Sequence, residues 1–166
     1  MLEPTPINGK ALLAREAAAR REGSGITAAS LEGEWWLQQL WTREGSDQNA
    51  TAALLRTVGA SLAIRQGGSH LELCNRVQLG PLVLEFTGPG QLSGKRPLLR
   101  FRFGRVALLW AGRVLWQASL PEPGPQQMPF FALIACQRLG DQGWLAARGR
   151  GGGLALWRLR PSAVRG

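Results

Sequence analysis

Residues 70–79 read HLELCNRVQL, and this stretch decides the fold class. Apolar side chains stand at alternate positions, so one face of an extended chain would carry Leu71, Leu73, Val77 and Leu79. Asn75 interrupts that apolar face. Such alternation is typical of an antiparallel strand with one face in the core and the other in water.

Short apolar runs of the same kind, bounded by Gly, Pro and Ser, lie on both sides of residues 70–79. The further predicted strands cover residues 33–42, 61–66, 82–87, 98–103, 106–110, 114–117, 130–136, 143–148 and 154–159. Residues 111–113 (AGR) suit a hairpin turn between two of them. Strands at intervals near ten residues predict a mainly β fold, an antiparallel sandwich or barrel, rather than β-α-β units.

Two helices are predicted among these strands. Residues 10–22 consist mostly of Ala, Leu, Glu and Arg, which favour a helix. Because Leu12 and Leu13 offer only a narrow apolar face, we expect this helix to pack lightly on the body of the protein. Residues 50–58 predict a second, shorter helix. Residues 1–9 are expected to be a flexible lead-in, 10–160 a single domain and 161–166 a tail.

The composition suits one domain with a core of its own. A chain of 166 residues can bury a core without disulfides or a structural metal. No apolar run is long enough to predict a membrane-spanning helix, and no secretory leader is visible, so we expect the protein not to be secreted. Cys74 and Cys136 are too few for a disulfide framework, and we expect both thiols to be reduced; the alternative is a single bridge between them.

The net charge of +9 is unevenly distributed. Residues 1–94 hold 8 basic and 9 acidic side chains, whereas residues 95–166 hold 12 basic and 2 acidic ones. This asymmetry predicts an anionic partner, namely lipid headgroups, an acidic protein or nucleic acid; the alternative is a solvated Arg-rich surface. If they share a face, the contact residues would be Arg100, Arg102, Arg148, Arg150 and Arg158.

No catalytic or metal-binding motif is present in the sequence. His70, the one histidine, falls on the polar side of its strand, and no Cys/His spacing suits a metal. The RGRGGG stretch at residues 148–153 lacks the following helix of a phosphate-binding loop, and it predicts a hairpin loop instead. We therefore predict no catalytic residue, no metal and no enzymatic activity.

Aromatic residues are concentrated in the predicted strands, since the chain has 7 Trp and 5 Phe. These rings suit either a fully packed core or the lining of an apolar ligand cavity, and both readings stay open. For the cavity, the candidate lining residues are Trp35, Leu37, Gln39, Trp41, Asn75, Phe101, Phe103, Trp110 and Trp116.

The order of short motifs resembles the plastid lipid-associated protein family, also called fibrillins. A helix with Leu12-Leu13 precedes L-x-G-x-W-x-L at residues 31–37, and Asn75-Arg76-Val77 follows. Gly143-Trp144-Leu145 and RGRGGGLALW at residues 148–157 stand where the family has its closing Arg-Gly segment and apolar strand. The acidic residue of the family's closing motif is absent, because Ala146-Ala147 follows Leu145. The resemblance covers most of residues 10–160.

The resemblance implies a lipocalin-like antiparallel β-barrel with a short N-terminal helix. It also implies non-enzymatic binding or protection of a hydrophobic molecule, such as a lipid, carotenoid or quinone, by a protein docked peripherally on an anionic membrane. A cyanobacterial-type member would act at the cytoplasmic side of the thylakoid membrane or in the cytoplasm. Two alternatives are a bilin lyase or chaperone-like barrel and a basic docking module. The docking module would bind an anionic partner, either an acidic protein or nucleic acid, and nucleic acid is the less expected of the two because the Trp rings are expected to be buried.

Overall fold

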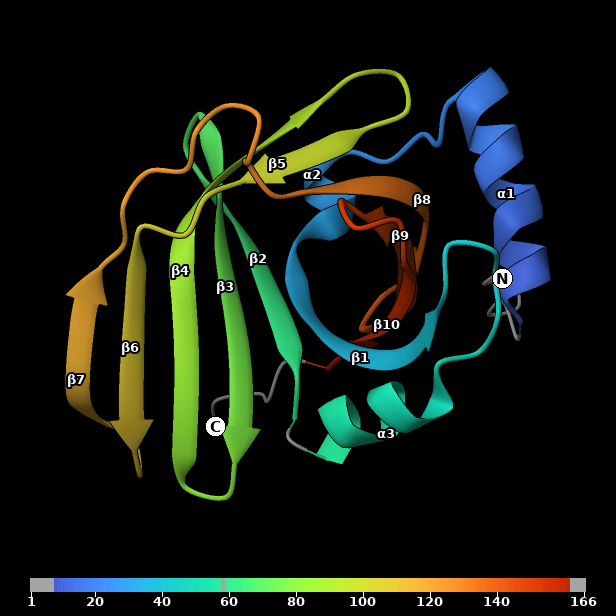
Figure 1. Cartoon of the computed structure of the whole chain (residues 1–166). Coiled ribbons are helices and arrows are strands. Elements are labelled where there is room, and N and C mark those ends of the chain that lie inside the picture. The colour runs from blue at the N-terminus through green and yellow to red at the C-terminus, as the bar shows by residue number, and fades with distance from the viewer. Residues whose placement is uncertain (1–7, 58, 162–166) are drawn as a thin grey trace.

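A single antiparallel sheet dominates the structure (Figure 1). The computed structural model describes residues 8–57 and 59–161, and within them ten strands and three helices are present. The helices are α1 (Gly9–Glu22), α2 (Ala28–Leu31) and α3 (Asn49–Thr57). The strands are β1 (Gly33–Trp41), β2 (Ser61–Gly67), β3 (His70–Leu79), β4 (Leu82–Ser93), β5 (Leu98–Phe101), β6 (Arg105–Trp110), β7 (Arg113–Ser119), β8 (Phe130–Leu139), β9 (Gln142–Gly149) and β10 (Leu154–Arg160).

Eight of the strands close into a barrel. Around it the order is β1, β2, β3, β4, β5, β8, β9 and β10, and each strand pairs with the next. The last strand returns to the first, with Trp35 opposite Leu159. This closed up-and-down arrangement is that of lipocalins and confirms the predicted fold class.

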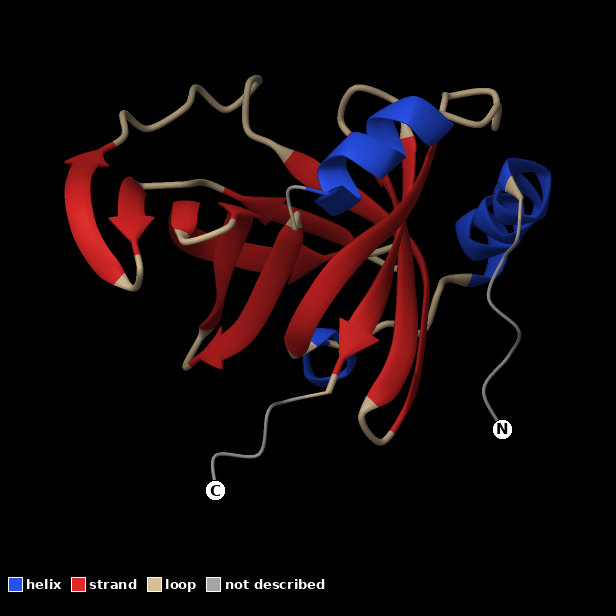
Figure 2. Ribbon diagram, turned by 90° about the horizontal axis from the view of Figure 1, so that it is seen from below, coloured by secondary structure: helices blue, strands red, loops and turns tan. Residues whose placement is uncertain are grey.

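Strand β4 is the point at which the sheet branches. Its first half, Leu82–Thr87, pairs with β6, and its second half, Gly90–Ser93, pairs with β5. Gly88 allows the branch, because a Cβ there would lie 1.8 Å from the carbonyl oxygen of Arg102. The β6–β7 hairpin therefore stands away from the barrel (Figures 1 and 2). Its turn has positive φ at both Ala111 (49°) and Gly112 (80°), as a two-residue type I′ loop requires.

Strands β8, β9 and β10 are buried on both faces. Leu133, Leu145 and Trp157 point into the barrel, while Ile134 and Trp144 face outward beneath α1. This double burial explains the near-continuous apolar runs of these strands, which lack the alternation of β3. At one end of the barrel α2 inserts Leu31, which is fully buried among the interior side chains.

Helix α1 is anchored firmly, contrary to the light packing expected. Leu12 is fully buried, and the carboxylate of Glu16 is buried among arginines. Arg148 donates to both Glu16 oxygens at 2.7 and 2.6 Å, and Arg96 donates at 2.6 Å. A hydrophobic pattern cannot reveal an anchor that is an ion pair, and this explains the wrong expectation.

Most predicted element boundaries lie within three residues of those observed. Strand β4 continues six residues beyond the predicted end, and β5 ends at Phe101 rather than at 103. The predicted lead-in and tail fall largely on residues 1–7 and 162–166, outside the described part of the chain. No helix within the described residues is long and apolar enough to cross a bilayer.

Candidate functional site

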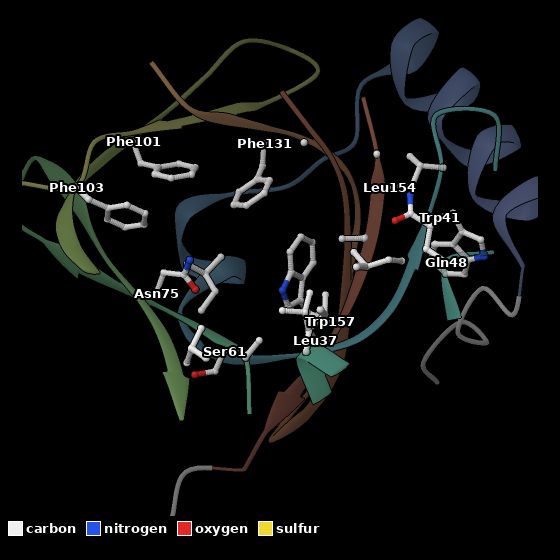
Figure 3. Close-up of a pocket in the computed structure, with 18 residues that line it drawn as sticks. Leu37, Trp41, Gln48, Ser61, Asn75, Phe101, Phe103, Phe131, Leu154 and Trp157 are labelled. Atoms are coloured by element: carbon white, nitrogen blue, oxygen red, sulfur yellow. The ribbon is translucent and has the colours of Figure 1, made fainter. Parts of the chain in front are cut away.

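The barrel encloses an apolar cavity of about 370 Å³ (Figure 3). It reaches the end of the barrel opposite α2, where α3 and the β9–β10 loop lie. The residues that line it are Leu37, Leu40, Trp41, Gln48, Leu55, Ala60, Ser61, Leu62, Asn75, Val77, Phe101, Phe103, Phe131, Gly149, Gly153, Leu154, Ala155 and Trp157.

Strand alternation positions most of this lining. Residues 71, 73, 75 and 77 of β3 all face the barrel interior, so Asn75 and Val77 continue the row that Leu71 and Leu73 begin. Leu62 of β2 lies directly opposite Asn75 in the register. The interior polar group of β3 is thus flanked by apolar side chains on its neighbour.

Four aromatic rings form one wall of the cavity. Trp157 packs edge-on against Phe131 at 5.4 Å between ring centroids, and Phe131 lies 5.2 Å from Phe101. Phe101 lies 5.2 Å from Phe103 in turn. Phe103 then meets Phe86 of β4 at 5.8 Å, so the row of rings leaves the cavity and reaches the branch of the sheet.

The cavity lining contains no charged side chain. Its polar side chains are those of Gln48, Ser61 and Asn75. Figure 3 shows the Asn75 amide pointing into the cavity, and it makes no hydrogen bond with any described residue. An amide offers two donor hydrogens and an acceptor oxygen, so Asn75 can bind a carbonyl or hydroxyl group of a ligand.

Five of the nine residues predicted to line a cavity do so: Leu37, Trp41, Asn75, Phe101 and Phe103. Four do not. Trp35 points inward but is fully buried near α2, where its indole N–H donates to the Leu31 carbonyl at 2.7 Å. The side chain of Gln39 donates to Asn49 Oδ1 at 2.7 Å, and an irregularity in β1 between residues 37 and 39 breaks the alternation there.

Trp110 and Trp116 were wrongly placed in the cavity because a simple meander was assumed. Both lie on the β6–β7 hairpin, outside the barrel, and are 51% and 54% exposed. Sequence reasoning in turn missed Leu62, Val77, Phe131 and Trp157 as lining residues. Val77 could have been predicted from the alternation of β3, because it lies two positions after Asn75 and so shares its face.

The five arginines predicted to form an anionic-surface contact do not form one face. Arg148 is held by Glu16, Arg102 pairs with Glu122, and Arg150 donates to the carbonyl oxygens of Gln126 and Gln127. Arg100 and Arg158 are exposed, but β8 and β9 separate their strands. The sequence could not reveal that intramolecular acceptors occupy three of these side chains.

The Glu16–Arg148 ion pair borders the open end of the cavity. Hydrogen bonds from Arg148 hold the pKa of Glu16 below its usual value of about 4.5. Arg148 also donates to the carbonyl oxygens of Gly152 and Arg43, in the two loops beside the opening. The ion pair therefore fixes α1 and both loops to each other.

The thiols and the histidine lie outside the cavity. Burial raises the pKa of Cys74 and of Cys136 to about 11. Both are free, and Cys136 Sγ contacts the Ser30 carbonyl oxygen at 3.4 Å. His70 is exposed beside Glu72, as predicted. Within the described residues no three His, Cys, Asp or Glu side chains are grouped to hold a metal ion.

Comparison of the chain with models of known protein families and with curated proteins found no match. The assignment of a function therefore rests on the geometry of the cavity.

Proposed function

We propose that this protein binds one neutral apolar molecule, such as a quinone, carotenoid or other lipid, inside the barrel without acting as an enzyme. The cavity is the observation that carries the proposal. Its volume of about 370 Å³ falls at the lower end of the range of small-molecule sites, roughly 300–1,000 Å³. Aromatic and aliphatic walls with a few polar groups, here Gln48, Ser61 and Asn75, are the lining that an apolar ligand needs.

The absence of charge in the lining supports a neutral ligand. An ionised group buried without a partner costs several kcal/mol, and none of the lining residues could pair with a carboxylate. This argues against a bilin, whose propionates would need cationic partners, and so against the lyase-like alternative. A cavity of this volume suits a ring system or part of a longer chain whose remainder leaves through the opening beside α3.

The place of action comes from the fibrillin resemblance alone. That resemblance supplies the photosynthetic membrane as the source of the ligand, and we keep it as part of the proposal. The basic half of the chain, residues 95–166, gives only weak support for docking on an anionic membrane, because Arg102, Arg148 and Arg150 already have partners within the protein.

A pair of probes that differ only in charge tests the proposal. Retinol, a neutral isoprenoid alcohol, is titrated against the protein and followed by its fluorescence, and retinoic acid is measured by competition at pH 8. We expect retinol to bind at least about tenfold more tightly, because a buried carboxylate would be unpaired. Equal affinity for the two probes, or binding of neither, would overturn the proposal.

A cavity-filling variant locates the binding. Val77→Trp places an indole inside the cavity and should abolish retinol binding, while Val83→Trp makes the same change on the outer face of the neighbouring strand. Unchanged binding by Val77→Trp would show that the probe sits elsewhere. Mass spectrometry of an organic extract of protein from a pigment-rich host would then identify the natural ligand.

A further inference from the structure

The β6–β7 hairpin carries most of the exposed apolar surface. Seven large apolar side chains in the described residues are more than half exposed, and four of them lie on this hairpin: Trp110, Val114, Leu115 and Trp116. They point to both faces of the sheet, since Trp116 lies on the inner face opposite Leu108 and Val114 on the outer face opposite Leu109. Apolar exposure of this extent in one place marks an interaction surface.

Strand β7 also has an open edge. Within the described residues, β7 is the one strand of the sheet with a single neighbour, because the other nine each pair on both sides. The backbone N–H of Leu120 donates to the Gly104 carbonyl oxygen. Because backbone groups alternate in direction along a strand, the N–H and C=O groups of Trp116 and Ala118 point toward β6. The backbone groups of Gln117 and Ser119 therefore face the open edge. Figures 1 and 2 show this strand at the outer margin of the molecule.

The edge has few of the features that normally protect such strands. Exposed edges usually carry Lys, Pro or an inward charge, but residues 114–119 (VLWQAS) contain none of these. The one protective irregularity is the bulge at Leu115, and it leaves residues 116–119 regular. An additional strand would suit this edge, because its backbone would pair with the unpaired N–H and C=O groups and its side chains would cover the apolar side chains on both faces.

We propose that β7 pairs with β7 of a second copy of this chain, in antiparallel register about Gln117. In this register Gln117 would exchange both backbone hydrogen bonds with the partner's Gln117. Trp116 would lie opposite the partner's Ala118, a large side chain beside a small one on the same face. The arrangement satisfies the requirement that a two-fold interface be complementary to itself.

Charge is compatible with this partner. The chain carries a net charge of +9, so two copies repel each other over most approaches. Residues 114–121 contain no charged side chain, and the nearest arginine, Arg113, lies beyond the partner's Ser119 in the proposed register. No like charges would therefore be brought directly opposite each other, an arrangement that destabilises strand pairs.

A lipid bilayer fits the edge less well than a second copy does. Hydrocarbon would cover the apolar side chains but would leave the N–H and C=O groups of Gln117 and Ser119 without partners. Because a pairing of seven-residue strands buries less than the roughly 1,200 Å² of a stable interface, the dimer should be reversible, with a Kd between about 10 and 500 μM.

Sedimentation velocity between 1 and 500 μM tests the proposal on the full chain. We expect the mass to rise from 18.0 kDa toward twice that value as the concentration increases. Gln117→Pro removes an edge-facing donor and keeps every apolar side chain of the patch, and it should hold the protein monomeric. Leu115→Lys should do the same, whereas Leu139→Lys, an equally exposed site at the end of β8, should dimerise like the parent chain. Melting curves identify any variant that fails to fold.

Two results would overturn the proposal. One is a monomer at 500 μM, and the other is a dimer that survives Gln117→Pro in a folded protein. Flotation with phosphatidylcholine vesicles separates the rival occupant. A parent chain that stays monomeric but floats, and that loses flotation in Leu115→Lys and not in Gln117→Pro, would assign the patch to lipid. No residue of β7 lines the cavity, so retinol binding and dimerisation can fail independently.

Discussion

Replacing Glu16 by Gln removes the charge at the centre of the α1 anchor and should destabilise the protein substantially. Breaking a buried ion pair by removal of one partner costs about 3–5 kcal/mol. Here Arg148 and Arg96 are 15% and 24% exposed, and the Gln carbonyl can still accept one hydrogen bond. Arg20 is 57% exposed and adds little. We therefore expect a loss near the lower end, about 3 kcal/mol.

This loss should be measurable as a lower melting temperature. For a domain of this size 1 kcal/mol corresponds to about 2–4 °C, so Glu16→Gln should lower Tm by about 6–12 °C. Circular dichroism follows the transition. Glu22→Gln is the matched control, because it makes the same change at an exposed position of the same helix, where surface substitutions typically alter stability by less than 0.5 kcal/mol.

A double-mutant cycle tests the reasoning behind the magnitude. Glu16→Gln and Arg148→Gln should be non-additive by about 1–3 kcal/mol, because each leaves the other side chain without its partner. If Glu16→Gln melted within 2 °C of Glu22→Gln, the carboxylate would not anchor α1 and the reasoning would be refuted. Additive losses would show that Arg148 stabilises the loops independently of Glu16.

Three further predictions concern pH, the thiols and the branch of the sheet. Arg148 lowers the pKa of Glu16 in the folded protein below about 4.5, so the stability that this ion pair contributes should be complete above pH 5 and should decline as the pH falls further. The difference in unfolding free energy between the parent chain and Glu16→Gln, measured in urea, should therefore be smaller at pH 3 than at pH 6. With pKa values of about 11 instead of 9.0, Cys74 and Cys136 should react with iodoacetamide at pH 8 roughly 100-fold more slowly than an ordinary thiol, and rapid labelling there would contradict the burial described. Gly88→Ala should cost about 3 kcal/mol in urea unfolding because its Cβ would overlap the Arg102 carbonyl, whereas Gly104→Ala, with no atom within 4 Å of its added Cβ, should cost less than about 1 kcal/mol; equal losses would refute the close approach.

Local alternation predicted much of the barrel. Strand β3 was predicted with its observed bounds, because one face is buried and the other is in water. Strand β4 was ended too early, at residue 87, because Gly88-Pro89-Gly90 is a strong turn signal. In the folded chain those residues mark the change of partner from β6 to β5, and pairing partners are not encoded in a local pattern.

The cavity lining was predicted only in part, because a local pattern does not show which strands pair to form the barrel. Asn75, Phe101 and Phe103 were found because their strands alternate and lie in the barrel. Trp110 and Trp116 also lie in segments predicted as strands, but the β6–β7 hairpin that carries them leaves the barrel at the branch in β4. The anchor of α1 was also beyond reach, because Glu16 and Arg148 are 132 positions apart in the chain.

The pairing of β1 with β10 has a consequence for how the protein is made. Trp35 and its partner Leu159 lie at opposite ends of the chain, so the barrel cannot close until the last strand has left the ribosome. At about 5–20 residues per second, synthesis of the intervening segment takes roughly 6–25 s. During that time β1 keeps an open edge and the apolar interior stays accessible to chaperones. A hydrophobic ligand present at the site of translation could enter before closure.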